Sequence, residues 1–260
     1  MNAQQYQQEI WNMKVSVKIS LQNSNILPMY IQIHRQHYLL FYYQQIHDVQ
    51  INKKIQHFDS CQDNKINQIS LQFKNIILPY QIPFGVLVDL YYSQDPFTPM
   101  ELILIYQKET YFIDLEDEIK NQIKFNLKQA AFGRYNHEGY GTPLKNLTQY
   151  MSINDEKQAL KQIKSFENKE DLYKYYRKIF ESPKTKRFQL PIRIYFKKGG
   201  HFQTVIELKD QQQTIGQALD TKLQGTKYIF NGLPLNINIP ALDFYDCLYS
   251  IDGFCYFVCE

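Results

Sequence analysis

The chain has 260 residues, of which 44% are apolar and 21% are charged, enough apolar material for about one to three globular domains. Its net charge of +3 lacks the clustered basicity of dedicated nucleic-acid-binding proteins, so we expect no nucleic-acid partner. The N-terminal residues have no signal-peptide pattern, and no apolar run reaches the ~18 residues of a membrane span.

The first third of the chain alternates between apolar and polar residues in several short stretches, which predicts strands. The predicted strands are 15–21, 27–33, 67–73 and 100–106. Residues 3–12 and 37–47 are expected to form helices, and the polar residues 48–65 a loop. The segment IPFGVLVDLYY (82–92) is apolar and bounded by proline.

The middle of the chain is helical in pattern. Residues 114–132 begin with acidic side chains and continue with lysines, an order that suits the helix dipole. Apolar residues recur at i, i+4 spacing along one side, at Leu115, Ile119, Ile123 and Leu127. A glycine-rich loop (133–144) and two further predicted helices, 152–166 and 168–180, follow.

The last quarter returns to the two-residue period. The expected order is a hairpin, a helix, a strand, a proline-started connection and a final strand. These elements are 190–196 with 202–208, 214–223, 227–235, 240–249 and 254–260. This succession is typical of a ubiquitin-like β-grasp unit, in which a sheet curls around one helix.

The first third runs through the same order, which suggests an internal repeat. A shift of 157 residues aligns 73–97 with 230–254 and gives nine identities in 25 positions. The identities include Pro83 with Pro240 and Asp89 with Asp246. We therefore expect an α+β protein with two ubiquitin-like β-grasp units around a helix-rich middle.

Residues with catalytic or metal-binding chemistry are scattered. His34 and His37 have no acidic or cysteine ligand nearby in sequence, and the acidic neighbours of Cys61 disfavour a thiolate. The four cysteines contain no CxxC pair, and we read them as reduced thiols of a cytosolic protein. We expect no catalytic residue, no metal and no cofactor, although a small enzyme with an unrecognised site stays open as an alternative.

Several motifs, taken together in their order and spacing, resemble the autophagy protein 5 family over nearly the whole chain. They are EIWNMKVSVKISL (9–21), IPFGVLVDLYY (82–92), LPIRIYF (190–196), TIGQAL (214–219) and IFNGLPL with IDGF (229–254). The resemblance implies an N-terminal helix (1–13), a first ubiquitin-like domain (14–110), a helix-rich domain (111–187) and a second ubiquitin-like domain (188–260). The stretches 46–66 and 133–144 match nothing in these patterns.

The resemblance also implies a function without an active site. The family is joined by an isopeptide bond to the ubiquitin-like autophagy protein 12. The conjugate binds the N-terminal helix of autophagy protein 16, and the assembly stimulates ligase-like transfer of autophagy protein 8 to phosphatidylethanolamine during autophagosome formation. Such a protein is cytoplasmic and associates peripherally with the phagophore membrane through its complex. An unconjugated adaptor that forms only non-covalent complexes is the alternative.

Two sites follow from the family's motifs. The acceptor lysine lies in a motif close to L/M-K-E/Q-A, which corresponds here to 127–130 and makes Lys128 the conjugation acceptor for the conjugating enzymes. For autophagy protein 16 we expect a groove between the two β-grasp units and the N-terminal helix, with Ile10 and Trp11 as candidate contacts. Trp11, the only tryptophan, either anchors that interface or pins the helix onto the first sheet, and both roles are compatible.

Overall fold

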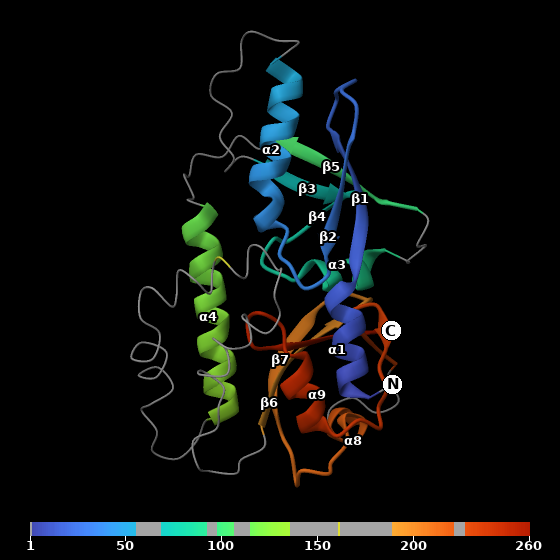
Figure 1. The fold of residues 1–260 in the computed structure, drawn as a ribbon, viewed down its shortest axis with the longest axis vertical. Coiled ribbons are helices and arrows are strands. Elements are labelled where there is room, and N and C mark those ends of the chain that lie inside the picture. The colour runs from blue at the N-terminus through green and yellow to red at the C-terminus, as the bar shows by residue number, and fades with distance from the viewer. Residues whose placement is uncertain are drawn as a thin grey trace. The chain divides into compact units, whose positions relative to one another are not determined.

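The computed structural model describes residues 2–55, 69–92, 98–106, 115–135, 161, 189–220 and 227–260. These residues form two compact units, Asn12–Ile119 and Met1–Trp11 with Lys120–Glu260. We call them the N-terminal unit and the C-terminal unit (Figure 1). The helices expected at 152–166 and 168–180 and the loop at 136–144 lie outside the described residues, apart from residue 161.

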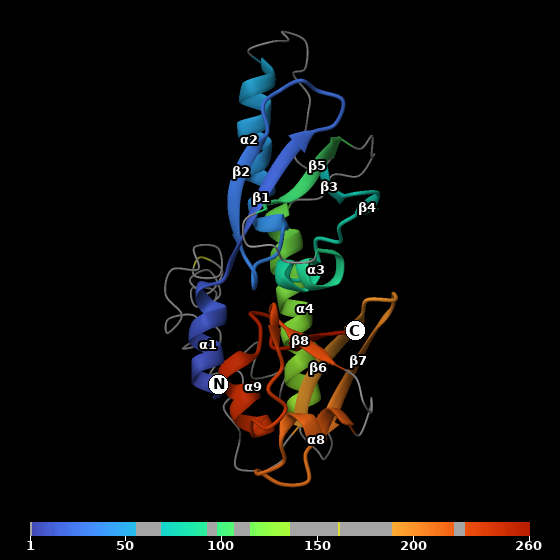
Figure 2. The same cartoon turned by 90° about the vertical axis from the view of Figure 1, so that its right-hand side faces the viewer.

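The N-terminal unit is a five-stranded sheet of order β2-β1-β5-β3-β4, with helices on one face (Figure 2). Its elements are β1 (Lys14–Leu21), β2 (Met29–His34), α2 (Leu40–Ile55), β3 (Ile69–Phe73), β4 (Ile76–Ile77), α3 (Phe84–Tyr91) and β5 (Met100–Tyr106). The two central strands, β1 and β5, are parallel. Alternate residues of β1, from Val15 to Leu21, are buried, which confirms the period-two reading of this strand.

The C-terminal unit repeats this arrangement in a second five-stranded sheet, of order β7-β6-β10-β8-β9. The elements are α4 (Leu115–Tyr135, from residue 120 on), β6 (Gln189–Phe196), β7 (His201–Glu207), α8 (Ile215–Asp220), β8 (Tyr228–Phe230), β9 (Leu233–Pro234), α9 (Ala241–Leu248) and β10 (Cys255–Cys259). Again the central strands, β6 and β10, are parallel. The helix α1 (Ala3–Asn12) belongs to this unit up to Trp11.

The repeat predicted from the 157-residue shift is confirmed element by element. Helix α3 maps onto α9, each is preceded by a proline at its N-cap, and each is eight residues long. Strand β4 maps onto β9. The turns before these strands also agree, because Lys74 (φ 51°) and Asn231 (φ 50°) both adopt the left-handed conformation.

Three local predictions were incomplete or wrong. Residues 48–55 continue helix α2 instead of forming a loop, because its buried stripe (Leu40, Tyr43, Ile46) fixes the first half and helix formation propagates cooperatively from there. The expected strand at 227–235 is a small hairpin, β8–β9. The Asn231-Gly232 pair turns it, with positive φ at both residues, as a type I′ turn requires.

The third incomplete prediction concerns the two segments that begin with a proline, which the structure shows to be the helices α3 and α9. Both α3 and α9 are short, and α3 is apolar on nearly every side, so the sequence contains no amphipathic period to identify it. Gly85 and Phe84 donate backbone hydrogen bonds to the carbonyls of Arg35 and His37, which fastens α3 to the end of β2.

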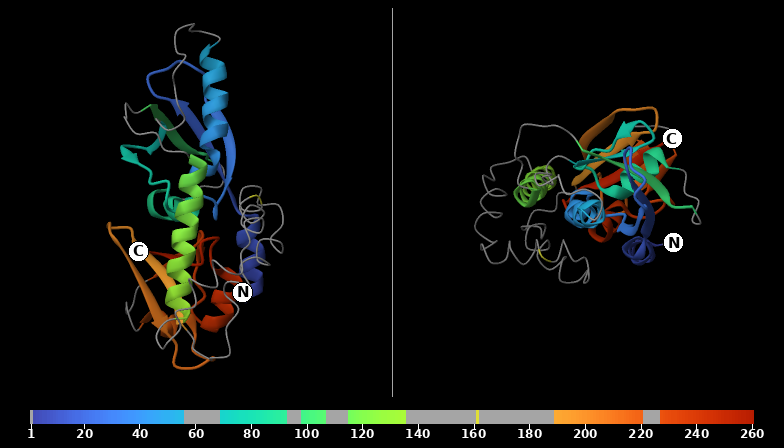
Figure 3. Two further views of the ribbon diagram at one scale, coloured as in Figure 1. Left: turned by 90° about the vertical axis from the view of Figure 1, so that its left-hand side faces the viewer. Right: turned by 90° about the horizontal axis from the view of Figure 1, so that it is seen from above.

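The central strand of the C-terminal sheet is buried at all five positions, Cys255–Cys259. One face of β10 carries Phe257, which packs against Phe230 and Phe244 of the β8–α9 side. The opposite face carries Tyr256, which lies under α4. Helix α4 therefore covers one face of this sheet while α8 and α9 occupy the other (Figures 1 and 3).

Candidate functional site

Helix α4 carries the predicted acceptor motif and has one buried and one exposed side. Ile123, Asn126, Leu127 and Ala130 are at most 5% exposed. Asn121, Phe125 and Gln129 are exposed. The helix is therefore amphipathic, and its buried side faces the C-terminal sheet.

Lys128 lies within this helix. With about 100° of rotation per residue, position 128 falls about 20° from position 121 and about 60° from position 125. Both of those residues are exposed. By helical register, position 128 therefore falls on the same half of α4 as positions 121 and 125, and the acceptor role of Lys128 stays a prediction.

A buried polar network fastens the opposite half of α4 to the sheet. Asn126, which is 0% exposed, donates from Nδ2 to Oδ2 of Asp252 over 2.9 Å. Its Oδ1 accepts a hydrogen bond of 2.9 Å from Nη2 of Arg193 on β6. A carboxylate only accepts and a guanidinium only donates, so these two partners fix the orientation of the amide.

Arg193 and Asp252 are themselves connected through β10. Arg193 Nη1 donates to the hydroxyl of Tyr256 over 2.8 Å, and that hydroxyl donates to Asp252. The guanidinium also lies 4.0 Å above the ring of Phe254 and 3.6 Å from the Asp252 carboxylate. The Arg193 Nε donates to Gln203 on β7. Four segments of the unit therefore meet at one set of hydrogen bonds.

Burial determines the protonation of this cluster. Desolvation and the neighbouring Asp252 carboxylate raise the pKa of Tyr256 well above its usual value of 10.0. Tyr256 therefore stays a neutral hydroxyl at physiological pH and can donate to Asp252 while it accepts from Arg193. The ion pair and the hydroxyl together satisfy charges that would be costly to bury alone.

The N-terminal helix docks on the C-terminal unit through Tyr6. The Tyr6 hydroxyl donates to the carbonyl of Pro234 and accepts from the backbone N–H of Asn236. A reciprocal capping box between Asn2 and Gln5 starts the helix. The body of the helix is therefore held by the C-terminal unit, and the interpretation that Trp11 pins it onto the first sheet stays a prediction.

The two candidate contacts for a helical partner differ in exposure. Ile10 is 1% exposed and belongs to the core of the C-terminal unit. Trp11 is partly exposed. Of the two, Trp11 offers surface to a partner, and a binding role for either residue stays a prediction.

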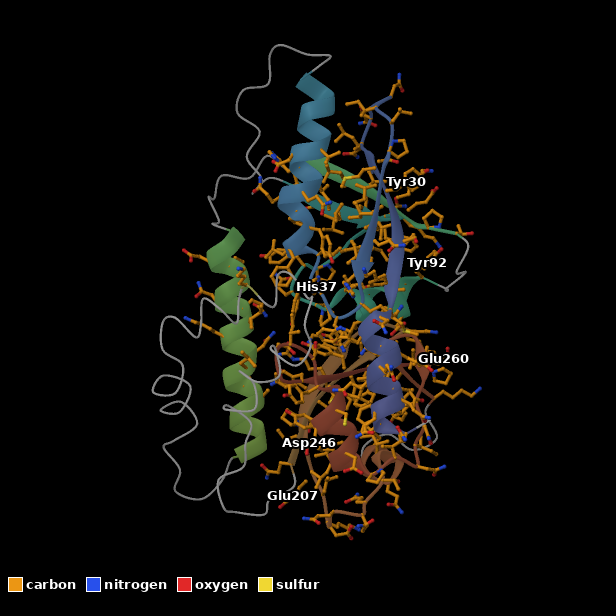
Figure 4. The ribbon with its side chains drawn as sticks, viewed as in Figure 1. Tyr30, His37, Tyr92, Glu207, Asp246 and Glu260 are labelled. Carbon is orange, nitrogen blue, oxygen red and sulfur yellow. The ribbon has the colours of Figure 1, made fainter. Side chains whose placement is uncertain are left out.

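The other predicted site features have simple positions. His37, labelled in Figure 4, hydrogen-bonds through Nδ1 to the Tyr42 hydroxyl. The described residues contain no group of three or more potential metal ligands. Cys255 and Cys259 lie buried in strand β10. Among the described helices, none is both long and apolar enough to cross a membrane.

Sequence reasoning did not assign a role to the four residues of the network. Two of them lie in recognised motifs, Arg193 in LPIRIYF and Asp252 in IDGF. Asn126 had a signal of its own, because a polar residue three positions after Ile123 and four before Ala130 falls on the apolar side of the helix. Such a residue is expected to have a buried partner.

Comparisons with known proteins agree with the duplicated fold. Residues 10–106 match the family model described as autophagy protein ATG5, UblA domain, and residues 189–259 match the model described as autophagy protein ATG5, UblB domain. The crystal structure of Kluyveromyces marxianus Atg5 superposes with a TM-score of 0.77 at 21% identity, over 98% of this chain and 99% of that one. No curated protein sequence matches the chain significantly.

Proposed function

This chain belongs to the autophagy protein 5 family, and from that premise we propose that it is a non-catalytic scaffold joined through Lys128 to the ubiquitin-like autophagy protein 12. The family assignment covers both ubiquitin-like domains and makes it an autophagy protein. The observation that supports the acceptor assignment is the burial of Asn126 in α4, because position 128 is about 200° around the helix from it.

The proposed reaction at Lys128 is an acyl transfer. The ε-ammonium first loses a proton to solvent or to a base on the conjugating enzyme. The neutral amine then attacks the carbonyl carbon of the thioester between the C-terminal glycine of autophagy protein 12 and a cysteine of that enzyme. A C–N bond forms, the C–S bond breaks, and the thiolate leaves and takes up the proton that the attacking nitrogen releases.

We propose that the resulting conjugate binds the N-terminal helix of autophagy protein 16 and that Trp11 contributes to this contact. Its partial exposure and its position at the end of α1 support that role, since aromatic residues often anchor interfaces. The assembly would stimulate transfer of autophagy protein 8 to phosphatidylethanolamine. Its proposed location is the cytoplasm, with recruitment to the phagophore membrane through the complex.

The acceptor can be tested by reconstitution with autophagy protein 12 and its activating and conjugating enzymes. The wild-type chain should show one band shifted by the mass of one modifier on a denaturing gel, and Lys128→Arg should abolish it. Lys124→Arg, one helical turn earlier, is the matched control and should leave the shift intact. A shift that survives Lys128→Arg refutes the acceptor assignment. No shift in the wild-type chain favours the unconjugated adaptor, which forms only non-covalent complexes.

A further inference from the structure

We propose that the buried network of Asn126, Arg193, Asp252 and Tyr256 is a positioning device that sets the rotation of α4 and so presents the acceptor lysine to the charged conjugating enzyme. This inference rests on the proposed function, because it assigns a role to residues beneath Lys128. The four residues are positioning residues, since none of them contacts the reacting atoms.

The apolar contacts of α4 alone fix its rotation only loosely. Ile123, Leu127 and Ala130 bury the helix, but hydrophobic contact is non-directional and tolerates small rotations. Hydrogen bonds weaken steeply when they are bent or stretched. Asn126 makes two of them, each 2.9 Å long, to partners of opposite charge at a fully buried position. A rotated helix would leave the Asn126 amide without these partners at a fully buried position and would take one hydrogen bond from Arg193 and one from Asp252, which is costly.

Position 128 lies close to this anchor and almost opposite to it. Two residues of helix correspond to about 3 Å along the axis and about 200° around it. Any rotation that displaces Asn126 therefore displaces position 128 by the same angle. A rotation of about 20° moves a group at the helix surface, about 5–6 Å from the axis, by about 2 Å.

The duplicated fold provides an internal comparison. In the N-terminal unit, the fifth residue of β1 and the second residue of β5 are Lys18 and Glu101, which form an ion pair with side chains 29% and 67% exposed. The same strand positions in the C-terminal unit are Arg193 and Tyr256, both part of the buried network. The β-grasp fold therefore does not require the network, and within the described residues it accompanies the helix α4 that covers this face of the C-terminal sheet.

The test is single-turnover conjugation of the full-length chain by the conjugating enzyme charged with autophagy protein 12. Asn126→Leu removes both hydrogen bonds and replaces the amide by an apolar side chain with the same branching. Asn121→Leu is the matched control, the same substitution at an exposed position of the same helix. The readouts are the rate at saturating thioester, the half-saturation concentration and the modified lysine identified by mass spectrometry.

We expect Asn126→Leu to lower the saturating rate by about tenfold, because a misplacement of about 1 Å can cost about a hundredfold and the flexible lysine side chain absorbs part of it. Half-saturation should change little, and a detectable share of the product should move to Lys120 or Lys124. Asn121→Leu should leave rate and site unchanged. Gly216→Ala, which destabilises the same unit in α8, should lower the melting temperature without redirecting conjugation.

A second variant keeps the test decisive if Asn126→Leu does not fold. Asn126→Asp combined with Asp252→Asn exchanges the amide and the carboxylate and preserves an amide–carboxylate bond beside Arg193. Each single substitution should slow conjugation, and the exchanged pair should recover to within about threefold of wild type. An unchanged rate and site in Asn126→Leu, or an exchanged pair no faster than its single variants, overturns the positioning role and leaves the proposed function intact. A wild-type chain that is not modified at Lys128 overturns both.

Discussion

The buried ion pair between Arg35 and Asp89 predicts an unusually large loss of stability for a single substitution in the N-terminal unit. Arg35 Nη2 bonds to the Asp89 carboxylate and to the carbonyl of Gly85 over 3.0 Å. The two side chains are 1% and 5% exposed. Asp89→Asn would leave a guanidinium in the core without an anionic partner. Removing one member of a buried pair costs about 3–5 kcal/mol of unfolding free energy.

The paired replacement should cost far less. Arg35 Nε and Nη1 are buried without a hydrogen-bond partner among the described residues, so the native pair already carries a desolvation cost. The double replacement Arg35→Met with Asp89→Leu puts apolar residues of similar volume at both positions. It removes the desolvation cost of the two charges together with the electrostatic attraction between them. We expect this double variant to lie within about 2 kcal/mol of wild type. If Arg35→Met and Asp89→Leu each cost about 3–5 kcal/mol alone, the coupling between the two sites is at least about 4 kcal/mol.

The internal repeat supplies the control for this prediction. Asp246, labelled in Figure 4, occupies the position of Asp89 in the equivalent helix α9, but it is exposed. Asp246→Asn should therefore change stability by no more than about 0.5 kcal/mol. Because a chain with two units need not unfold in one step, urea denaturation followed by circular dichroism should be combined with amide hydrogen exchange in β1 and α3. If Asp89→Asn is as mild as Asp246→Asn, our account of the pair is refuted.

Three further predictions concern the C-terminal unit. Gly216→Ala would place a Cβ atom 2.6 Å from the Cβ atom and 2.9 Å from the carbonyl oxygen of Ile237. It should therefore lower the unfolding free energy, measured by thermal or urea denaturation, by about 1–3 kcal/mol. An unchanged denaturation midpoint would contradict the close approach. Tyr6→Phe removes the hydroxyl that bonds to the carbonyl of Pro234. It should lower the unfolding free energy by about 1–3 kcal/mol and increase amide hydrogen exchange in α1. Equal exchange in the wild type and the variant would argue against the docking role of Tyr6. Burial raises the pKa of Tyr195 from 10.0 to about 12. Between pH 10 and 12 the folded state therefore keeps a proton on Tyr195 that the unfolded state loses. The contribution of Tyr195 to the unfolding free energy is complete below pH 10. It should fall by about 1.4 kcal/mol per pH unit as the pH rises from 10 towards 12. Absorbance at about 295 nm reports tyrosine ionisation, and Tyr195→Phe should flatten the alkaline stability curve; an identical curve would exclude Tyr195 as its source.

The sequence predicted the strands well because their chemistry is local. The β1 residues alternate between the core and the surface, and the β6–β7 hairpin turns at Gly199 and Gly200, both with positive φ. Because the two halves of the chain share the same order of elements, the internal repeat predicted the same β-grasp arrangement for both units. Elements without a period were not predicted, since α3 buries nearly all its sides and β9 has only two residues.

The candidate site was predictable only in part, for a related reason. The motif 127–130 identifies the acceptor position, and the stripe at Ile123 and Leu127 gives the helix its direction. The anchor of the helix depends on residues that are far apart in sequence. Asn126 meets Asp252 across 126 positions, and no local pattern specifies such a pair. Long-range polar contacts of this kind emerge only when the fold brings the segments together.

The two repeats show how one fold was adapted for two different surfaces. Both units bury the inner face of their sheet with apolar strand residues and a short proline-capped helix, α3 or α9. Their outer faces differ at equivalent positions, with the partly exposed ion pair of Lys18 and Glu101 in one and the partly buried Arg193 with the buried Tyr256 in the other. Buried polar groups are costly unless every partner is present. In the C-terminal unit, Arg193 donates one hydrogen bond to Asn126 of α4 and others to the sheet, and it forms an ion pair with Asp252. The specialisation of this unit thus lies in the covering helix, which is the element that carries the proposed acceptor.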